Sequence, residues 1–247
     1  MAHRSCFLAG LVLAVVPWTG LRSQFRVDVE TGAAFSGYNN VAIPGKTGTR
    51  LSLSEELSSN PVPFVRIRVG RTFGAKHDFS VLAAPLRIRS SGRVDRPVFF
   101  EGVRFPAQAP LESRFRFDSY RLTYRYDFLR KQSWTAGVGI SAKIRDASIS
   151  LKSPGLFSEK KNTGFVPLVH FRIHGEPHRR LGILVEGDAL AGPQGRAEDV
   201  LIAGTLRLFS KIRMKFGYRI LEGGADVEQT YNFTLVHYAV AGILVGM

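Results

Sequence analysis

The chain has 247 residues, and its 34 Lys and Arg residues against 20 Asp and Glu residues give a formal net charge of +14. A chain of this length suits one large domain, and a single cysteine excludes a disulfide framework. The basic charge would allow nucleic-acid binding, but the Lys and Arg residues are scattered singly through apolar segments and form no basic stripe, so we do not expect nucleic acid as a partner.

Residues 1–23 have the pattern of a secretory signal peptide. After a short basic start comes an apolar run, Phe7–Val16, which is too short to cross a bilayer as a helix. We expect cleavage near Ser23-Gln24 or at Thr19-Gly20. Because Cys6 lies inside this segment, the mature chain would contain no thiol, and residues 24–247 would form one barrel domain.

From residue 25 onward, apolar and polar residues alternate with a period of two, which indicates β-strands long enough to cross a bilayer at a tilt. The clearest case sets Tyr120, Leu122 and Tyr124 against Arg121 and Arg125. About ten strands are expected in this way. Their ranges are 25–37, 62–74, 77–89, 114–128, 133–150, 164–174, 180–191, 198–208, 212–221 and 228–245.

The connections between these strands alternate between long and short. Each long or medium connection joins an odd strand to the next even one, and the even-to-odd connections are tight turns. This rhythm is typical of a membrane barrel with short periplasmic turns and longer external loops. The long connections are 38–61, 91–113 and 151–163, and the medium ones are 192–197 and 222–227.

Two prolines, Pro85 and Pro167, fall inside predicted strands. Proline has no amide hydrogen, so each one removes a possible hydrogen bond from the strand ladder. We therefore expect a bulge or a local break in strand pairing at both positions.

The signal segment, the alternation, the loop rhythm and a last strand at Tyr231–Leu244 resemble the small outer-membrane β-barrel proteins of Gram-negative bacteria. The stretches Arg116–Tyr126 and Leu221–Asp226 also look like segments of a group of uncharacterised barrel proteins. The resemblance implies an all-β fold, a closed antiparallel transmembrane barrel in the outer membrane. It brings no activity with it.

Basic residues dominate the predicted inward face. An excess of buried positive charge needs water, ions, an anionic ligand or paired acids. We favour ion pairing within a narrow barrel, with binding of a small anionic solute as the functional alternative. The candidate binding cluster is Arg66, Arg68, Arg87, Arg89, Arg121, Arg125, Lys143 and Arg145. The acids expected inside the barrel are Asp28, Glu30, Asp127, Glu186 and Asp188.

No catalytic constellation is recognisable in the sequence. An outer-membrane phospholipase or lipid A deacylase would resemble a His-x-Ser pair on one strand face, because the base must reach the nucleophile. His77 and Ser80 instead fall on opposite faces. An omptin-like protease would need acids and an Asp-His couple near the external rim, where Asp199 and Asp226 are plausible rim acids without a histidine.

Two histidines, His170 and His174, share the polar face of the sixth predicted strand. With no carboxylate expected nearby, we interpret them as polar residues that fill the lumen, and we predict neither a metal nor a cofactor. A basic surface would favour outer-membrane lipid and lipopolysaccharide as partners, and we expect a monomer.

The sequence thus predicts an outer-membrane β-barrel of unspecified role, either a narrow anion-selective channel or a structural barrel with a basic lumen. A barrel of this size leaves too little free lumen for a wide pore. Two alternatives stay open, namely an enzyme acting on lipid A or surface peptides and a soluble lipocalin-like barrel. Aromatic residues near strand ends, such as Trp134 and Phe128, favour the membrane version.

Overall fold

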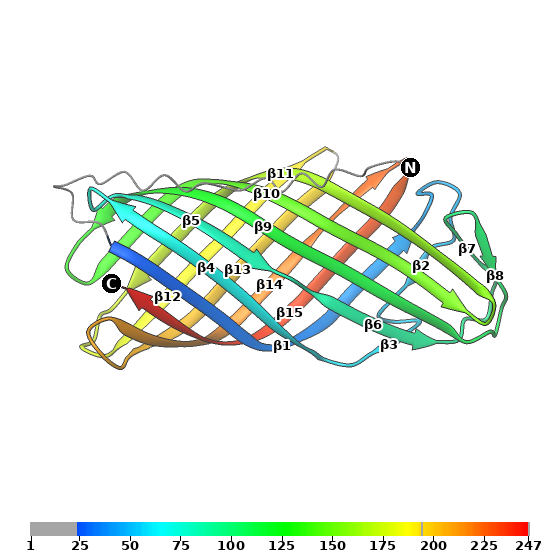
Figure 1. Cartoon of the computed structure of the whole chain (residues 1–247), viewed down its shortest axis with the longest axis horizontal. Helices are drawn as coiled ribbons and strands as arrows, with labels where there is room; N and C mark the ends of the chain where they lie inside the picture. Colours follow the sequence, from blue (N-terminus) through cyan, green and yellow to red (C-terminus); the bar gives the residue numbers. More distant parts are fainter. Residues whose placement is uncertain (1–23, 194, 247) are drawn as a thin grey trace, which may run out of the picture.

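The computed structural model describes residues 24–193 and 195–246, so the expected signal segment 1–23 lies outside the described residues. They form a closed antiparallel barrel of ten wall strands (Figure 1). No described helix is long and apolar enough to cross a membrane. The wall consists of β1 (Gln24–Ala42), β4 (Val62–Phe73), β5 (His77–Ala84) continued by β6 (Arg87–Gly92), β9 (Leu111–Arg130), β10 (Trp134–Ser153), β11 (Leu156–Gly175), β12 (Leu181–Gly192), β13 (Gly195–Arg207), β14 (Ile212–Val227) and β15 (Thr230–Gly246).

The ring closes because β1 pairs with β15 while β9 pairs with β10, both antiparallel. The predicted fold class, an all-β closed transmembrane barrel of about ten strands, is confirmed. The start of β1 and the end of β15 lie side by side, since Arg26 pairs with Gly246 (Figure 1). This end carries the connections that the sequence predicted to be tight turns, so we name it the turn end, and we name the opposite end, which carries the two long connections, the loop end.

The third wall strand breaks at Pro85, as predicted. β5 ends at Ala84 and β6 begins at Arg87, and between them Leu86 exchanges two backbone hydrogen bonds with Phe117 of β9. At Pro167 the result is different. β11 runs through the proline without interruption, but its pairing with β12 stops at Val169, opposite Ala189.

The predicted connection 151–163 is wrong. β10 continues to Ser153 and β11 starts at Leu156, so residues 154 and 155 alone make the turn. The predicted medium connections also belong largely to strands, since β12 and β13 pair up to Gly192 and Gly195. These segments are strand-forming but carry polar residues on their outer side, which gives them the composition of loops.

The polarity of the wall inverts along its length, and β9 shows this most clearly. At mid-height, within the apolar belt, Leu122 faces outward with 58% of its surface exposed, while Arg121 is buried inside. Near the loop end, Phe115 is buried inside with 4% exposed and Arg114 is exposed outside. The side chains keep the same alternation along β9. Its outer face therefore suits hydrocarbon at mid-height and water near the loop end.

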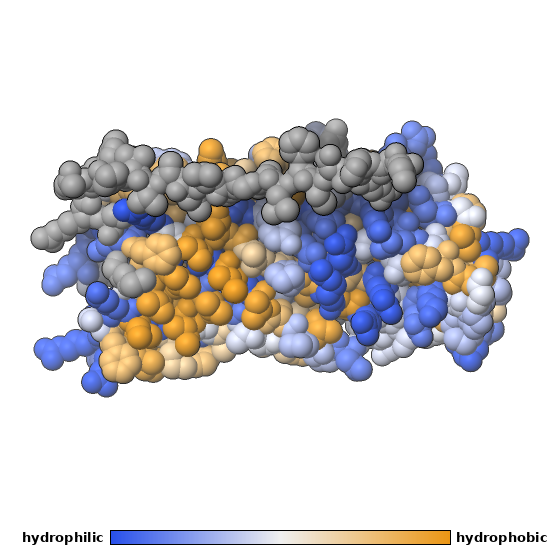
Figure 2. Space-filling view, viewed as in Figure 1, coloured by the Kyte–Doolittle hydropathy of each residue, from blue (hydrophilic) through white to orange (hydrophobic). Residues whose placement is uncertain are grey.

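Apolar side chains gather on the outer face over the turn-end half, and hydrophilic ones cover the loop-end half (Figure 2). This apolar belt is what a strand needs where it meets hydrocarbon. Trp134 and Phe128 are exposed at turn-end strand termini, as an interfacial aromatic residue would be. Exposed belt residues include Val65, Ile67, Phe79, Val81, Leu122, Val138, Ile140, Val169, Ile183, Ile202 and Phe216.

At the loop end, two long connections fold over the inner face of the barrel. They carry β2 (Leu51–Ser52), β3 (Ser58–Ser59) and the hairpin of β7 (Val98–Phe100) and β8 (Val103–Phe105). Their buried side chains, such as Leu57 and Phe100, pack with inward-facing Leu151 of β10 in one apolar cluster. The loop end therefore has a small core like that of a soluble protein, which fixes the long connections in place.

Candidate functional site

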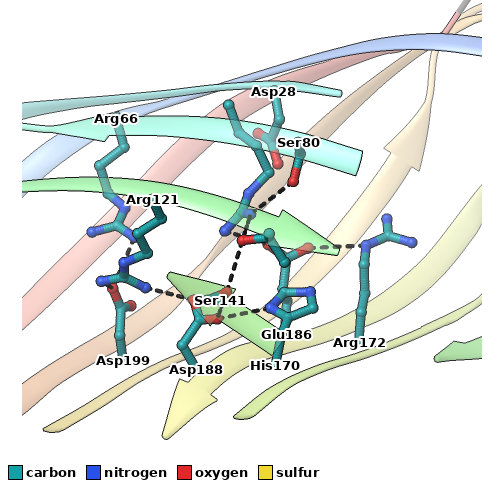
Figure 3. Close-up of polar contacts among 12 residues, drawn as sticks. Asp28, Arg66, Ser80, Arg121, Ser141, His170, Arg172, Glu186, Asp188 and Asp199 are labelled. Atoms are coloured by element: carbon teal, nitrogen blue, oxygen red, sulfur yellow. Dashed lines mark hydrogen bonds and ion pairs between the residues drawn. The ribbon is translucent and has the colours of Figure 1, made fainter. Parts of the chain in front are cut away.

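Ion pairs cross the barrel at mid-height, and Arg121 is at their centre (Figure 3). From β9 it donates to Asp188 of β12 and to Asp199 of β13, on the opposite wall. Arg66 of β4 reaches the same Asp199 carboxylate at 2.9 Å. All four side chains are at most 5% exposed, so the contacts are shielded from bulk water.

A second set of contacts joins β1 to β14. Arg219 donates to Glu30 at 2.7 Å and also binds Asp199, which links this set to Arg121. Lys215, which is fully buried, donates to Glu30 at 2.7 Å and to Asp28 at 2.8 Å. Each of these two cations thus binds two acids, as buried charges require.

Toward the turn end, Glu186 is shared by Arg68, at 3.2 Å, and Arg172, whose Nε donates at 2.9 Å. Arg125 donates to Asp127 at 2.6 Å and lies 3.5 Å from Asp78. We call this whole set of paired charges the ion plug, because it occupies the lumen between the two ends. Its members are Asp28, Glu30, Arg66, Arg68, Asp78, Arg121, Arg125, Asp127, Arg172, Glu186, Asp188, Asp199, Lys215 and Arg219.

The five acids predicted inside the barrel are confirmed there, and two more were missed. Asp78 is 1% exposed inside β5. Asp199, predicted as a rim acid, is instead buried at mid-height in the ion plug. Asp199 lies four residues before the buried Ala203 on β13, so the period-two alternation places it on the same inward face, and this signal was already present in the sequence.

His170 does have a carboxylate nearby, contrary to the expectation. Its Nδ1 lies 3.0 Å from Oδ1 of Asp188, and Ser141 donates to the same Oδ1 at 2.6 Å (Figure 3). In a hydrolytic triad the histidine stands between serine and acid. Here the acid stands between the other two, so Ser141 has no base to take its proton and the group is structural. The described residues contain no cluster of three or more His, Cys, Asp or Glu side chains suited to a metal.

The structure divides the eight residues of the candidate cluster among three locations. Arg66, Arg68, Arg121 and Arg125 belong to the ion plug and are bound by acids. Two residues, Lys143 and Arg145, face a cavity above the plug, toward the loop end. The remaining pair, Arg87 and Arg89, was predicted to face inward and does not.

Arg87 and Arg89 lie on the outer surface of β6, so this part of the prediction is wrong. Between them Ile88 is buried in the loop-end core, which fixes the faces of the strand. Arg87 pairs with Asp118 on the outer wall. The error has a physical cause, because β6 lies in the loop-end half, where basic residues belong outside and apolar ones inside.

The loop-end cavity has a volume of about 410 Å³. Leu221 and Thr234 on β14 and β15 contribute to one wall, and Phe115, Phe117 and Lys143 on β9 and β10 contribute to the opposite wall. The cavity thus combines aromatic and aliphatic surface with a small number of polar groups, the composition usual for ligand pockets.

The two cations of the cavity have no acid partner among the described residues. Lys143 is 3% exposed, and its Nζ lies over the Phe117 ring, 4.8 Å from the ring centroid. Arg145 donates to Asn162 through Nη2, while its Nε is buried with no hydrogen-bond partner. The cations of the ion plug, by contrast, form ion pairs with acids.

A second cavity of about 340 Å³ opens at the turn end. Its basic lining includes Arg26, which binds Asp78 at 3.0 Å, and Arg213, which binds Glu176 at 2.5 Å. These two arginines of the lining are therefore paired with acids. The lumen is therefore hollow at both ends and filled by the ion plug between them.

The closed wall, the apolar belt and the ion-paired interior define a transmembrane β-barrel of the outer-membrane type. Among solved structures, the chain is similar to OmpT, the outer membrane protease of Escherichia coli, with a TM-score of 0.57 and 6% identity over 91% of this chain and 97% of that one. It also matches the transport unit of the E. coli autotransporter AIDA-I, with a TM-score of 0.45 and 7% identity over 95% and 93% of the two chains. No family model and no curated protein matches the sequence.

A third similar structure is Ail, the attachment invasion locus protein of Yersinia pestis, with a TM-score of 0.38 and 8% identity over 90% of this chain and 99% of that one. At these identities the similarity shows the fold and carries no activity with it. The function has to be argued from the side chains.

Proposed function

We propose that this protein is an outer-membrane barrel, closed at mid-height, that binds a small anionic ligand in its loop-end cavity through Lys143 and Arg145. The observation that carries the proposal is that neither side chain forms an ion pair with an acid in the described part of the chain. In the described part of the interior, the cations of the ion plug have acid partners and these two do not.

The physical argument concerns the cost of buried charge. An isolated cation in a low-dielectric site is unfavourable, and proteins compensate it with an acid, water or a ligand. Lys143 and Arg145 are two residues apart on β10, so both side chains project into the same cavity. A carboxylate or phosphate group between them would receive charge-assisted hydrogen bonds from both, each worth roughly 1.5–3 kcal/mol.

The outer-membrane location, export through a cleaved signal peptide, and contact with lipopolysaccharide belong to the same proposal. The apolar belt fits hydrocarbon, and the loop-end half would then project from the cell. Basic side chains are exposed on its outer wall, among them Arg89, Arg114 and Lys161. Such residues favour phosphate-bearing lipid head groups through charge. We expect a monomer, because the wall closes within one chain.

A narrow anion-selective channel is the competing function, and the cavities at both ends of the lumen favour it. The ion plug argues against it, because a passing anion would have to displace carboxylates that already hold the arginines. An enzymatic function has no comparable support, because the Ser141, Asp188 and His170 group is in the wrong order for acyl transfer.

The binding proposal can be tested with butyrate and inorganic phosphate as probes on the barrel purified in nanodiscs. We expect saturable binding that weakens about tenfold or more in Lys143→Gln and Arg145→Gln, as the loss of a charge-assisted hydrogen bond implies. Lys161→Gln is the matched control, because this lysine is exposed on the outer wall. The proposal is overturned if neither probe binds the unmodified barrel. It is also overturned if Lys143→Gln and Arg145→Gln bind the probes as tightly as the unmodified barrel does.

A further inference from the structure

The wall of the barrel is incomplete between β11 and β12. β10 and β11 pair along their whole length, up to the turn at Ser153 and Leu156. β12 and β13 likewise pair up to Gly192 and Gly195. The pairing of β11 with β12, by contrast, ends at Val169 and Ala189. Residues 156–168 of β11 therefore border an open seam in the loop-end half of the wall.

Pro167 lies at the lower end of this seam. The ladder between β10 and β11 continues past it, with Ala142 opposite, so the missing amide hydrogen is not needed on that side. A proline within a sheet is tolerated where its nitrogen faces an unpaired edge. The sequence thus supports the seam as a feature of the fold.

The loop-end cavity extends to the seam. Its lining includes Phe165 and Pro167 from β11 together with Leu190 and Gly192 from β12, which are the two edges of the opening. Phe165 is 67% exposed and Leu190 is 39% exposed. Apolar side chains at both edges make the passage suited to a hydrocarbon chain, and Phe115 and Phe117 continue this surface inside.

The seam and the two cations are at the edge of the apolar belt. On the outer wall, Ile144 pairs with Phe165, both exposed and apolar, and the next outward pair is Asp146 with Thr163. Arg145 lies between these two pairs along β10. In a bilayer this is the depth at which acyl chains meet head groups. An anionic head group at that depth would be level with the cations inside.

We infer that the ligand is a single-chain amphiphile of the membrane, with a carboxylate or phosphate head, that enters sideways through the seam between β11 and β12. This inference rests on the proposed function and names the chemical class of its ligand. The head binds Lys143 and Arg145, and the chain lies against Phe117, Phe165 and Leu190. The cavity of about 410 Å³ is near the lower end of the usual range for ligand pockets, roughly 300–1,000 Å³, so it accepts one chain and not a lipid with several.

The test compares two carboxylates that share a head group, laurate and butyrate, on the barrel in nanodiscs, with empty nanodiscs as the blank. Binding is followed through the ¹³C-labelled carboxyl carbon by NMR. We expect laurate to bind at least about tenfold more tightly than butyrate, and Lys143→Gln to weaken both. Butyrate tests the anion site of the proposed function, and the difference between laurate and butyrate tests the amphiphile inferred here.

A second variant tests the route. A Cβ at Gly192 would meet nothing within 4 Å, so Gly192→Trp fits the fold and fills the seam edge. We expect it to slow the association of laurate and to weaken laurate binding about tenfold more than butyrate binding. Gly204→Trp is the matched control, since Gly204 is exposed on the outer face of β13 and its Cβ has one neighbour, 3.9 Å away.

Three results would overturn part of this scheme, and each points to a different step. If laurate and butyrate bind with equal affinity and both depend on Lys143, the proposed anion site stands, but the proposal that the ligand is an amphiphile fails. Laurate binding whose rate and affinity are both unchanged in Gly192→Trp removes the lateral route. Absence of binding by both carboxylates removes the anion site itself.

Discussion

Asp188 and Asp199 lie directly opposite each other on β12 and β13, and both carboxylates are bound by the same guanidinium, that of Arg121. Like charges in a cross-strand pair repel each other. The pair is stable in the fold because Arg121 reaches it from β9, on the far side of the lumen. One side chain therefore connects opposite walls of the barrel and bridges two carboxylates that repel each other, with Arg66 and Arg219 as further partners of Asp199.

We predict that Arg121→Met destabilises the barrel by about 3–5 kcal/mol, since removing one partner of a buried ion pair leaves uncompensated charge. The free energy of unfolding can be measured in urea with the barrel inserted in lipid vesicles. Lys143→Met is the matched substitution, because this lysine is equally buried but has no acid partner. It should leave the unfolding free energy unchanged or raise it, and equal losses in both variants would contradict the assignment of partners.

The outward orientation of Arg87 and Arg89 predicts a labelling pattern. In a Cys6→Ser background, which removes the only cysteine, cysteines at positions 87 and 89 should react with a membrane-impermeant maleimide on intact cells. A cysteine replacing Arg68 should not react, because that site is 5% exposed inside the barrel. Protection at positions 87 and 89 together with reaction at 68 would reverse the face assignment.

The period-two pattern was sufficient to predict the barrel, the strand order and the inward position of residues such as Glu30 and Glu186, because alternation fixes faces wherever one side meets hydrocarbon. It failed at Arg87, Arg89 and the segment 151–163. There the wall leaves the apolar belt, and the rule that basic residues face the lumen no longer applies. Composition changes at that boundary while the alternation itself continues.

The partners of the inward charges could not be predicted, for a geometric reason. Arg121 meets Asp188 and Asp199 across the lumen, at separations of 67 and 78 residues. Those contacts depend on the tilt and register of every strand between them, which a one-dimensional pattern does not contain. Pro167 indicated a local break in strand pairing, where the seam begins. That Lys143 has no acid beside it could be seen only in the three-dimensional arrangement.

Restoring the amide at position 167 should extend the strand ladder. In Pro167→Val we expect slower amide hydrogen exchange in the lower part of the seam, residues 166–168 of β11, because a valine can donate a hydrogen bond toward β12 and suits a strand. Amides in residues 148–152 of β10 serve as the internal reference. Unchanged exchange around position 167 would show that something other than the proline keeps the seam open.

The ion plug predicts that the barrel does not conduct. In planar bilayers at several salt concentrations, the protein should give no current steps above those of the protein-free detergent control. The reason is that Arg66, Arg121 and Arg219 are each already bound to acids at mid-height. A steady anion-selective conductance would instead favour the channel and would refute the closed lumen.

The contact between the two long connections should depend on pH. Arg96 beside Glu56 holds the pKa of that carboxyl below its ordinary value of 4.5, with a further contribution from the Ser52 amide. Because the pKa is lower in the folded loops, the contact stabilises them fully above the ordinary value and is lost as the pH falls through the lowered one.

Methyl NMR signals of Leu53 and Leu57, which are buried in the same loop-end core, can report this change. We expect them to broaden or shift in the native protein as the pH falls below the ordinary value of 4.5 and through the lowered pKa of Glu56. In Glu56→Gln the signals should be the same across that range. A native-like acid transition in the variant would assign the effect to another group.

The incomplete wall leaves β11 with a bare edge of backbone donors and acceptors, the kind of surface on which strands of other molecules add and aggregates begin. This edge carries Pro167 at its lower end and the charged pair Lys160 and Lys161 farther along. Both residue types disfavour strand addition. On the proposed lateral route, a flexible hydrocarbon chain needs no hydrogen bonds to pass, whereas a peptide strand would have to pair with an edge that disfavours strand addition.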